Sequence, residues 1–231
     1  MDIVVKNLTV KYGENVIFND FSASFAYGET SVIMGKSGIG KTTLLNCIAD
    51  LLPYEGSVEG VDGVAYVFQD DRLIKGLTVY ENLDFALSGV MEKDERVKNI
   101  KAVLEDVELI NKVSSFPTEL SGGEKKRVSL ARAFLSPKKI LLMDEPLNSL
   151  DLGLKSRITD LFLDLKSKYG KTVITVTHDV EDALSIADKI SVIDKGKEVY
   201  QYTFTDSPKG RDIYGEECNE VRKIISNCLR T

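Results

Sequence analysis

The first thirty-four residues alternate between apolar and polar side chains. Residues 4–10 (VVKNLTV), 21–25 (FSASF) and 29–34 (ETSVIM) show the period of two that is typical of half-buried strands. Tyr-Gly pairs at 12–13 and 27–28 lie between these runs and favour turns. We therefore predict three N-terminal strands separated by two turns.

The period changes after residue 40. Residues 41–50 (KTTLLNCIAD) carry apolar side chains at helical spacing, and residues 65–68 (AYVF) predict a short strand. From 76 to 135 the pattern is helical, and its clearest helix is predicted at 94–107 (DERVKNIKAVLEDV). The middle of the chain is therefore predicted to be a helical insertion.

Strand-like runs return after Pro137. They lie at 139–143 (KILLM), 172–177 (TVITVT) and 189–194 (KISVID), with a helix predicted near 154–167. The second run is continuous and β-branched, as expected for a strand buried on both faces of a parallel sheet. The predicted fold class is an α/β core interrupted by the helical insertion.

The C-terminal tail has the pattern of an amphipathic helix. Helical spacing within VRKIISNCL places five apolar side chains on one predicted face: Val221, Ile224, Ile225, Cys228 and Leu229.

The composition is that of an ordinary globular protein. Of 231 residues, 43% are hydrophobic and 29% are charged, and the net charge of −6 argues against a nucleic-acid partner. No run of 18 apolar residues occurs, and the N-terminus lacks a secretory signal pattern. Cys47, Cys218 and Cys228 fit no disulfide or metal-site spacing, so we expect reduced thiols and a cytoplasmic protein.

Residues 35–42 (GKSGIGKT) fit the pattern G-x-x-x-x-G-K-[ST] between a predicted strand and a predicted helix. The glycines let successive backbone N–H groups face phosphate oxygens, and the helix start adds the positive end of its dipole. Lys41 is placed to reach the β- and γ-phosphates, and the Thr42 hydroxyl to bind Mg²⁺. The alternative, a chance match, is disfavoured by the flanking strand and helix.

An acidic pair follows the predicted strand at 139–143. Asp144 is placed to hold the Mg²⁺ shell, and Glu145 to orient and polarise an attacking water. The alternative interpretation is an acidic turn before Pro146.

Polar side chains also end two other predicted strands. His178, the only histidine, follows 172–177, and Gln69 follows 65–68. Ligands bind at the carboxyl ends of parallel strands, so we predict a γ-phosphate contact for His178 and a metal or water contact for Gln69. Each is alternatively an ordinary structural or surface residue, and Tyr12 is either an adenine-stacking aromatic or a packing one.

These landmarks, together with LSGG (120–123), ILLMDEP (140–146) and SLD (149–151), resemble in their order the ATP-binding cassette (ABC) family of ATPases. The resemblance extends from residue 2 to about residue 200. LSGG at this spacing is its most specific element, because other P-loop enzymes lack it.

The resemblance implies a division of the chain and a set of roles. One ABC ATPase domain, 1–231, would comprise a P-loop core with a mostly parallel sheet and an antiparallel β part (1–75 and 136–231) and a helical signature subdomain (76–135). Its cofactors would be ATP and Mg²⁺. The implied nucleotide contacts are Tyr12, Gly35, Lys36, Ser37, Gly38, Ile39, Gly40, Lys41, Thr42, Thr43, Ser121, Gly122, Gly123, Glu124 and Asp151; the metal contacts are Thr42, Gln69 and Asp144; and the catalytic residues are Glu145, His178, Lys41 and Gln69.

In the family, LSGG closes over ATP bound to a second cassette in a head-to-tail dimer. Residues 121–123 begin a predicted helix and would offer a hydroxyl, amides and a dipole end to a γ-phosphate. Ser121 with Glu124 also forms an S/T-x-x-E capping box, as does Thr78 with Glu81, so helix capping alone is the alternative.

Two signature positions depart from the family pattern. Glu124 and Lys126 stand where the family commonly has Gln. We expect an altered dimer surface, with hydrolysis retained.

We expect a cassette without a fused transmembrane segment. It resembles the ATPase subunits of bacterial or archaeal importers, which work with separate permease subunits and a solute-binding protein. Residues 67–83 are similar to the sulfonate, nitrate and taurine group, although Asp71 replaces a frequent proline. We expect a peripheral position on the cytoplasmic face of the membrane. Permease docking is expected near residues 69–83, on an apolar patch of Leu73, Ile74, Leu77 and Val79. The alternative for each of these side chains is the ordinary core of the helical insertion.

Other functions fit parts of the sequence. An exporter or lipid-complex ABC ATPase would use the same chemistry. A soluble ABC ATPase of DNA repair or translation is disfavoured by the acidic charge, and a small-molecule P-loop kinase is disfavoured by LSGG and His178.

Overall fold

The chain forms two sheets and a separate group of helices in the computed structural model, which describes residues 2–148 and 150–230. The smaller sheet is antiparallel, with strand order β2-β1-β4. Its strands are β1 (Ile3–Tyr12), β2 (Asn15–Phe25) and β4 (Glu55–Glu59). The predicted turn at 12–13 joins β1 to β2, so the alternating pattern does form a half-buried hairpin.

The larger sheet has six strands in the order β5-β6-β7-β3-β8-β9. All neighbouring strands run parallel except the last pair, β8 and β9. The strands are β3 (Thr30–Met34), β5 (Val64–Val67), β6 (Ile140–Asp144), β7 (Thr172–Thr177), β8 (Lys189–Asp194) and β9 (Lys197–Thr203). The predicted α/β fold class, with a parallel sheet and an antiparallel part, is confirmed.

Helices and strands cover both faces of this central sheet, which explains its apolar sequence. Leu142 and other side chains of alternate positions pack with the antiparallel sheet and helix α1 (Lys41–Ile48). Met143 and its equivalents pack on the opposite face with α5 (Leu152–Tyr169), α6 (Val180–Ile186) and α7 (Glu216–Arg230). A strand buried on both faces has no polar positions to alternate, and β7 is buried along its whole length.

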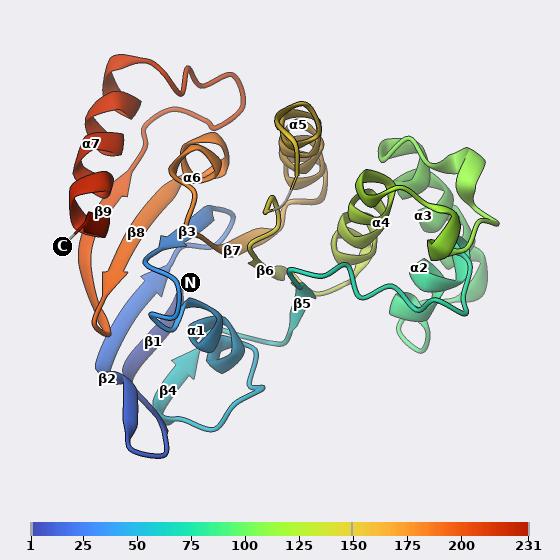
Figure 1. Ribbon diagram of the computed structural model, residues 1–231. Coiled ribbons are helices and arrows are strands. Elements are labelled where there is room, and N and C mark those ends of the chain that lie inside the picture. The colour runs from blue at the N-terminus through green and yellow to red at the C-terminus, as the bar shows by residue number, and fades with distance from the viewer. Residues whose placement is uncertain (1, 149, 231) are drawn as a thin grey trace.

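The helical insertion forms a lobe beside the sheets, at the right of Figure 1. It contains α2 (Val79–Leu87), α3 (Lys93–Asp106) and α4 (Gly122–Leu135), with short 3₁₀ turns at Ile110–Lys112 and Pro117–Glu119. Both predicted capping boxes are present at the starts of α2 and α4. The sequence pattern therefore located the beginnings of these two helices.

Two edge elements and one side chain differ from the sequence prediction. The strands β4 and β9 were not predicted; most of their side chains are exposed, and neither strand contains a fully buried residue. Within α7, Ile224 is 42% exposed, so the core covers the predicted apolar face only in part. Cys218 is buried there instead, together with Val221 and Ile225.

Among the residues that the structure describes, no helix is long and apolar enough to cross a membrane.

Candidate functional site

The glycine-rich loop connects β3 to α1 at the carboxyl edge of the central sheet. Gly40, the residue before α1, has a φ of 108°, and a Cβ there would lie 2.5 Å from the Ile17 side chain. A Cβ on Gly35 would lie 2.8 Å from the Ile193 carbonyl oxygen. Both positions therefore require glycine, for the backbone conformation in one case and for close packing in the other.

Lys41 is the first residue of α1 and is almost fully buried. Its Nζ donates hydrogen bonds to the carbonyl oxygens of Gly35 (2.8 Å) and Lys36 (3.0 Å). Burial lowers the pKa of Lys41, while the charges of Glu145 and Asp144 favour its protonated form. The ammonium is thus held inside the loop, where it can exchange carbonyl oxygens for phosphate oxygens.

Two oxygen donors suited to Mg²⁺ lie beside this lysine. The Thr42 hydroxyl donates to Asp144 Oδ2 at 2.9 Å, which joins the start of α1 to the end of β6. Burial raises the pKa of Asp144, the hydrogen bond from Thr42 opposes this shift, and the Glu145 charge adds to it. A hydroxyl and a carboxylate in contact are a donor set that fits Mg²⁺, which prefers oxygen ligands and often takes only one or two from the protein.

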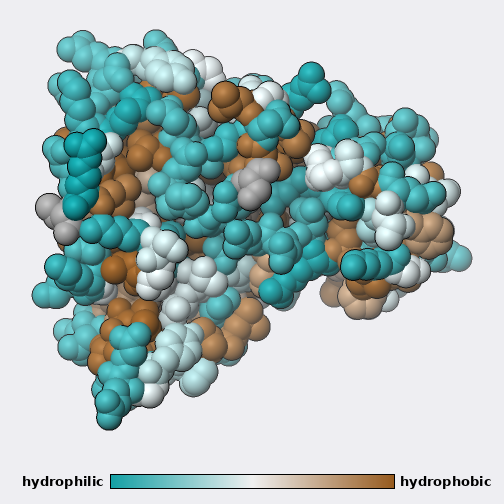
Figure 2. Space-filling view, viewed as in Figure 1, coloured by the Kyte–Doolittle hydropathy of each residue, from teal (hydrophilic) through white to brown (hydrophobic). Residues whose placement is uncertain are grey.

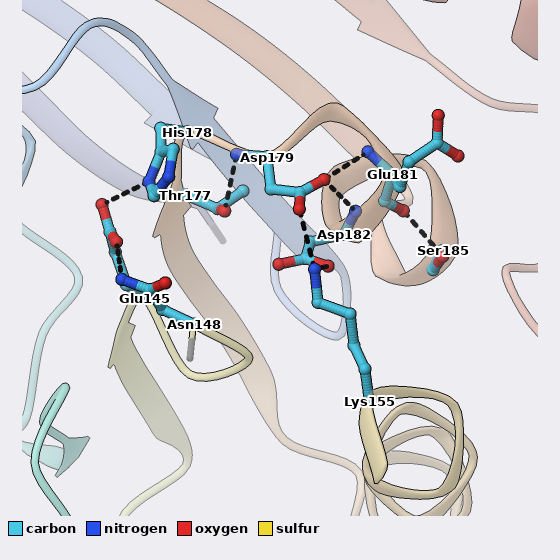
Figure 3. A network of polar contacts seen from close by, with 9 residues as sticks. All are labelled: Glu145, Asn148, Lys155, Thr177, His178, Asp179, Glu181, Asp182 and Ser185. Carbon is cyan, nitrogen blue, oxygen red and sulfur yellow. Dashed lines mark hydrogen bonds and ion pairs between the residues drawn. The ribbon is translucent and has the colours of Figure 1, made fainter. Parts of the chain in front are cut away.

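Glu145 is held between two side chains, as Figure 3 shows. His178 Nδ1 lies 3.0 Å from Glu145 Oε1, and Asn148 Nδ2 donates to Glu145 Oε2 at 2.9 Å. A carboxylate only accepts hydrogen bonds at neutral pH, so the Nδ1 of His178 carries the proton in this contact. The pair connects the ends of the neighbouring strands β6 and β7.

These groups line one cavity of about 500 Å³. It brings together most of the residues expected to contact phosphate, metal or water. The lining residues are Ile17, Ser37, Gly38, Gly40, Lys41, Thr42, Thr43, Gln69, Asp144, Glu145, Asn148 and His178. Ile17 and Asn148 were missed by sequence reasoning, because neither belongs to a motif with a distinctive pattern.

Nine expected nucleotide contacts lie outside this lining, and four of them belong to the phosphate loop or to β1. Gly35 and Lys36 supply the carbonyl oxygens that hold Lys41, and Ile39 donates its N–H to the Lys36 carbonyl. Tyr12 ends β1 with its side chain half exposed. Its adenine contact stays a prediction.

The LSGG residues line a different and larger cavity, of about 1150 Å³. Ser121, Gly122, Gly123 and Glu124 lie on one side of it, at the start of α4. Asp151 lines the same cavity and caps α5 by accepting a hydrogen bond from the Leu154 N–H at 3.0 Å. Within one chain, the phosphate loop and residues 121–123 therefore line two different cavities, which adjoin at Gln69 and Asn148. Ser149 of the SLD motif lies outside the described residues.

The two signature glycines have different surroundings. A Cβ on Gly123 would lie 2.7 Å from a methyl group of Leu154, so glycine allows α4 to pack against α5. A Cβ on Gly122 would have nothing within 4 Å among the described residues. A larger residue at 123 would therefore have to displace the Leu154 side chain, whereas the packing of this chain leaves room for a larger residue at 122.

Comparison with known families decides the identity of the site. The sequence matches the family described as ABC transporter over residues 18–148, which is the stretch that contains the phosphate loop, the LSGG helix and the acidic pair. This chain belongs to the ABC transporter family. As a member of that family it is an ATP-binding ATPase whose activity is coupled to transport.

Individual members of the ABC transporter family match along almost the whole chain. It is 36% identical over 224 residues to the aliphatic sulfonates import ATP-binding protein SsuB 2 of Mesorhizobium japonicum, covering 96% of this chain and 88% of that one. It is 33% identical over 230 residues to the spermidine/putrescine import ATP-binding protein PotA of Haemophilus influenzae, covering 94% and 60% of the two chains. The structure of cbiO1 from Clostridium perfringens, part of the ABC transporter complex cbiONQ, has a TM-score of 0.81 at 25% identity and covers 96% of this chain and 93% of that chain.

The departures from the ABC pattern have an internal explanation. Lys126 is only 4% exposed, so it adds little to an outer surface, whereas the expectation of an altered dimer surface stays a prediction for the half-buried Glu124. Its Nζ lies 3.8 Å from Asp71 Oδ1 and 3.5 Å from the Gln69 carbonyl oxygen. The two unusual residues, Asp71 and Lys126, therefore face each other between the Gln69 loop and α4.

One residue of the expected docking patch is not available to a partner protein. Val79 is fully buried at the start of α2 and forms part of the core. Ile74 is exposed, as are Phe85 and Val90 further along the helical lobe. In Figure 2, apolar atoms gather along the lower edge of this lobe.

Proposed function

We propose that this ABC ATPase hydrolyses ATP with the residues of the 500 Å³ cavity and drives the import of a small solute. The observation that carries the proposal is the contact of Glu145 with His178, next to the Thr42–Asp144 pair and the buried Lys41. This arrangement supplies a base, a group that orients it and a cation for phosphate within one cavity.

Each side chain has a task that its geometry supports. Lys41 exchanges its carbonyl partners for the β- and γ-phosphates, while Thr42 and Asp144, with Gln69, would hold Mg²⁺. Bound Mg²⁺ would neutralise charge on the phosphate oxygens. Glu145 orients the attacking water as its hydrogen-bond acceptor, with its own carboxylate fixed by His178. Hydrolysis then depends on residues from both β6 and β7.

A second copy of the cassette completes the site in this proposal. Ser121 and Gly122 would bind the γ-phosphate of ATP held by the partner, with Gly123, Glu124 and Asp151 around it. The open space at Gly122 supports this, since the fold of one chain does not require glycine there. The helical region, residues 76–135, would rock when the dimer closes on ATP and opens after hydrolysis, and the permease subunits would follow this motion.

The other partners follow from the relatives. We propose separate permease subunits docking near residues 69–83, a solute-binding protein, and a peripheral position on the cytoplasmic face of the membrane. The sulfonate-import relative favours an anion such as a sulfonate or nitrate as the solute. A polyamine-import relative has nearly equal identity, so sequence similarity does not decide between these solutes.

The proposal is tested with Glu145→Gln, which keeps the shape of the side chain and its contact with Asn148 but removes the base. We expect ATP binding to survive, hydrolysis to fall by a factor of about 10² to 10⁴, and light scattering to show a dimer only with Mg-ATP. Near-full hydrolysis by this variant would overturn the role of Glu145. A variant that binds ATP and remains a monomer would overturn the proposed dimer in the absence of the permease.

A further inference from the structure

The loop that carries His178 is fixed by the start of α6, as Figure 3 shows. Asp179 Oδ1 accepts hydrogen bonds from the N–H groups of Glu181 (2.8 Å) and Asp182 (3.3 Å), so Asp179 caps the helix. The N–H of Asp179 donates to Thr177 Oγ1 at 3.1 Å. The backbone on the C-terminal side of His178 is thus held by side-chain bonds.

A lysine from another helix holds this cap in place. Lys155 Nζ lies 2.7 Å from Asp179 Oδ2 and 2.6 Å from Asp182 Oδ1. The Asp182 side chain is only 6% exposed, and the Lys155 side chain is 20% exposed. Two carboxylates this close repel each other unless a cation lies between them, so the ammonium is what keeps both at the start of α6.

Lys155 also belongs to the turn that faces the LSGG cavity. It lies in the first turn of α5, where its N–H donates to the Asp151 carbonyl oxygen at 2.8 Å. Asp151 lines the 1150 Å³ cavity. One side chain therefore connects the turn at Asp151 with the loop that presents His178 to Glu145.

We infer that Lys155 is a positioning residue for hydrolysis: it holds the His178 loop so that Nδ1 reaches Glu145, and it links this contact to the seating of the Asp151 turn. The inference rests on the proposed roles of Glu145 and His178. It goes beyond them by assigning a function to a side chain that lines neither cavity.

A matched control lies on the same helix. Lys166 of α5 pairs with Asp188 through an Nζ–Oδ2 distance of 2.6 Å, and its side chain is 17% exposed. Asp188 also accepts a hydrogen bond from a backbone N–H, that of Thr30. Lys166→Met thus removes a similar ion pair from the same helix without touching the His178 loop.

The single histidine provides a readout that does not depend on activity. In the full chain prepared without a histidine tag, every imidazole NMR signal comes from His178. Nitrogen-detected spectra of the nucleotide-free wild type should show a protonated Nδ1. We expect Lys155→Met to shift or broaden this signal, Lys155→Arg to preserve it because the guanidinium bonds both carboxylates, and Lys166→Met to leave it unchanged.

Steady-state ATPase kinetics of the same variants test whether the position of His178 affects hydrolysis. We expect Lys155→Met to lower kcat by about 10- to 100-fold with little change in KM for ATP, because the phosphate loop is untouched and only the alignment of Glu145 is lost. Lys155→Arg should recover most of the loss. If Lys155→Met unfolds, Lys155→Met combined with Asp182→Asn removes the unpaired buried charge, and it should show the same two effects.

Three results would overturn the inference: Lys155→Met matching Lys166→Met in both readouts, a lower kcat with an unchanged His178 signal, or a changed signal with normal kcat. Glu145→Gln in the same assay distinguishes a failure of the proposed function from a failure of the role of Lys155. Retained hydrolysis in that variant would count against the proposed function, whereas an inactive Glu145→Gln beside an active Lys155→Met would count against the role of Lys155 alone.

Discussion

Glu145 has an unusual backbone for a residue with a side chain, with a φ of 45°. Its N–H donates to the Val176 carbonyl oxygen at 3.0 Å, and its own carbonyl accepts from the Asn148 N–H at 3.2 Å. Such a left-handed conformation costs free energy and persists where surrounding bonds enforce it, often at functional sites. Here it turns the carboxylate from the end of β6 towards His178.

Asn148 should influence hydrolysis although no motif contains it. Asn148→Ala removes the hydrogen bond to Glu145 Oε2 and leaves this carboxylate with His178 alone. Losing a hydrogen bond to a charged group costs about 1.5–3 kcal/mol, so we expect kcat to fall by about tenfold or more. ATP affinity, measured by calorimetry, should stay the same; a loss confined to ATP affinity would contradict this role.

Lys171 should make the unfolding free energy depend on pH in the alkaline range. It is buried, and its Nζ donates to the carbonyl oxygens of Ser136 and of Lys138, the latter at 2.5 Å. Burial lowers the pKa of Lys171 to about 8, whereas an unfolded lysine has a pKa of about 10.4. Between these values the unfolded chain binds more protons, so the contribution of Lys171 to stability rises with pH.

The measurement compares denaturant unfolding of the wild type and Lys171→Met from pH 7 to pH 10. The difference in unfolding free energy should shift in favour of the wild type above pH 8, by up to about 1.4 kcal/mol per pH unit. A difference that stays constant over this range would show that Lys171 titrates normally in the fold.

At the scale of elements, α7 distinguishes two neighbouring isoleucines. Ile225 is fully buried among the residues between α6, β8 and β9, whereas Ile224 is 42% exposed. Ile225→Ala should destabilise the fold by about 2–5 kcal/mol, because it leaves a cavity in the core. Ile224→Ala is the matched control and should cost well under half of that in the same thermal or chemical unfolding experiment. Equal costs would place both side chains in the core.

At the scale of the whole molecule, a substitution at Gly122 should affect dimerisation without lowering the stability of the monomer. Gly122→Ala meets nothing within 4 Å among the described residues, and alanine favours a helix over glycine by up to about 1 kcal/mol. The monomer should therefore unfold at the same or a slightly higher temperature. In the Glu145→Gln background, however, light scattering should detect less ATP-dependent dimer. The added methyl group would occupy the space in which we propose that the partner's nucleotide binds. An unchanged dimer would exclude a close contact at Gly122.

The sequence by itself determined those features that depend on local pattern. Alternation and β-branched runs located β1, β3, β6 and β7, and the capping boxes marked the starts of two helices. The spacing of GKSGIGKT, together with LSGG and the acidic pair, was enough to indicate the ABC family. These signals are readable because each lies within a few neighbouring residues, where backbone conformation depends on the side chains themselves.

Only the tertiary structure decided which distant residues meet. It placed the LSGG glycines and the phosphate loop in different, adjoining cavities, paired Asp71 with Lys126, and brought Lys155 to Asp179 and Asp182. It also separated Ile224 from Ile225 and formed the edge strands β4 and β9. Burial and pairing of this kind depend on partners far apart in the chain, and the periodicity of a single segment carries no record of them.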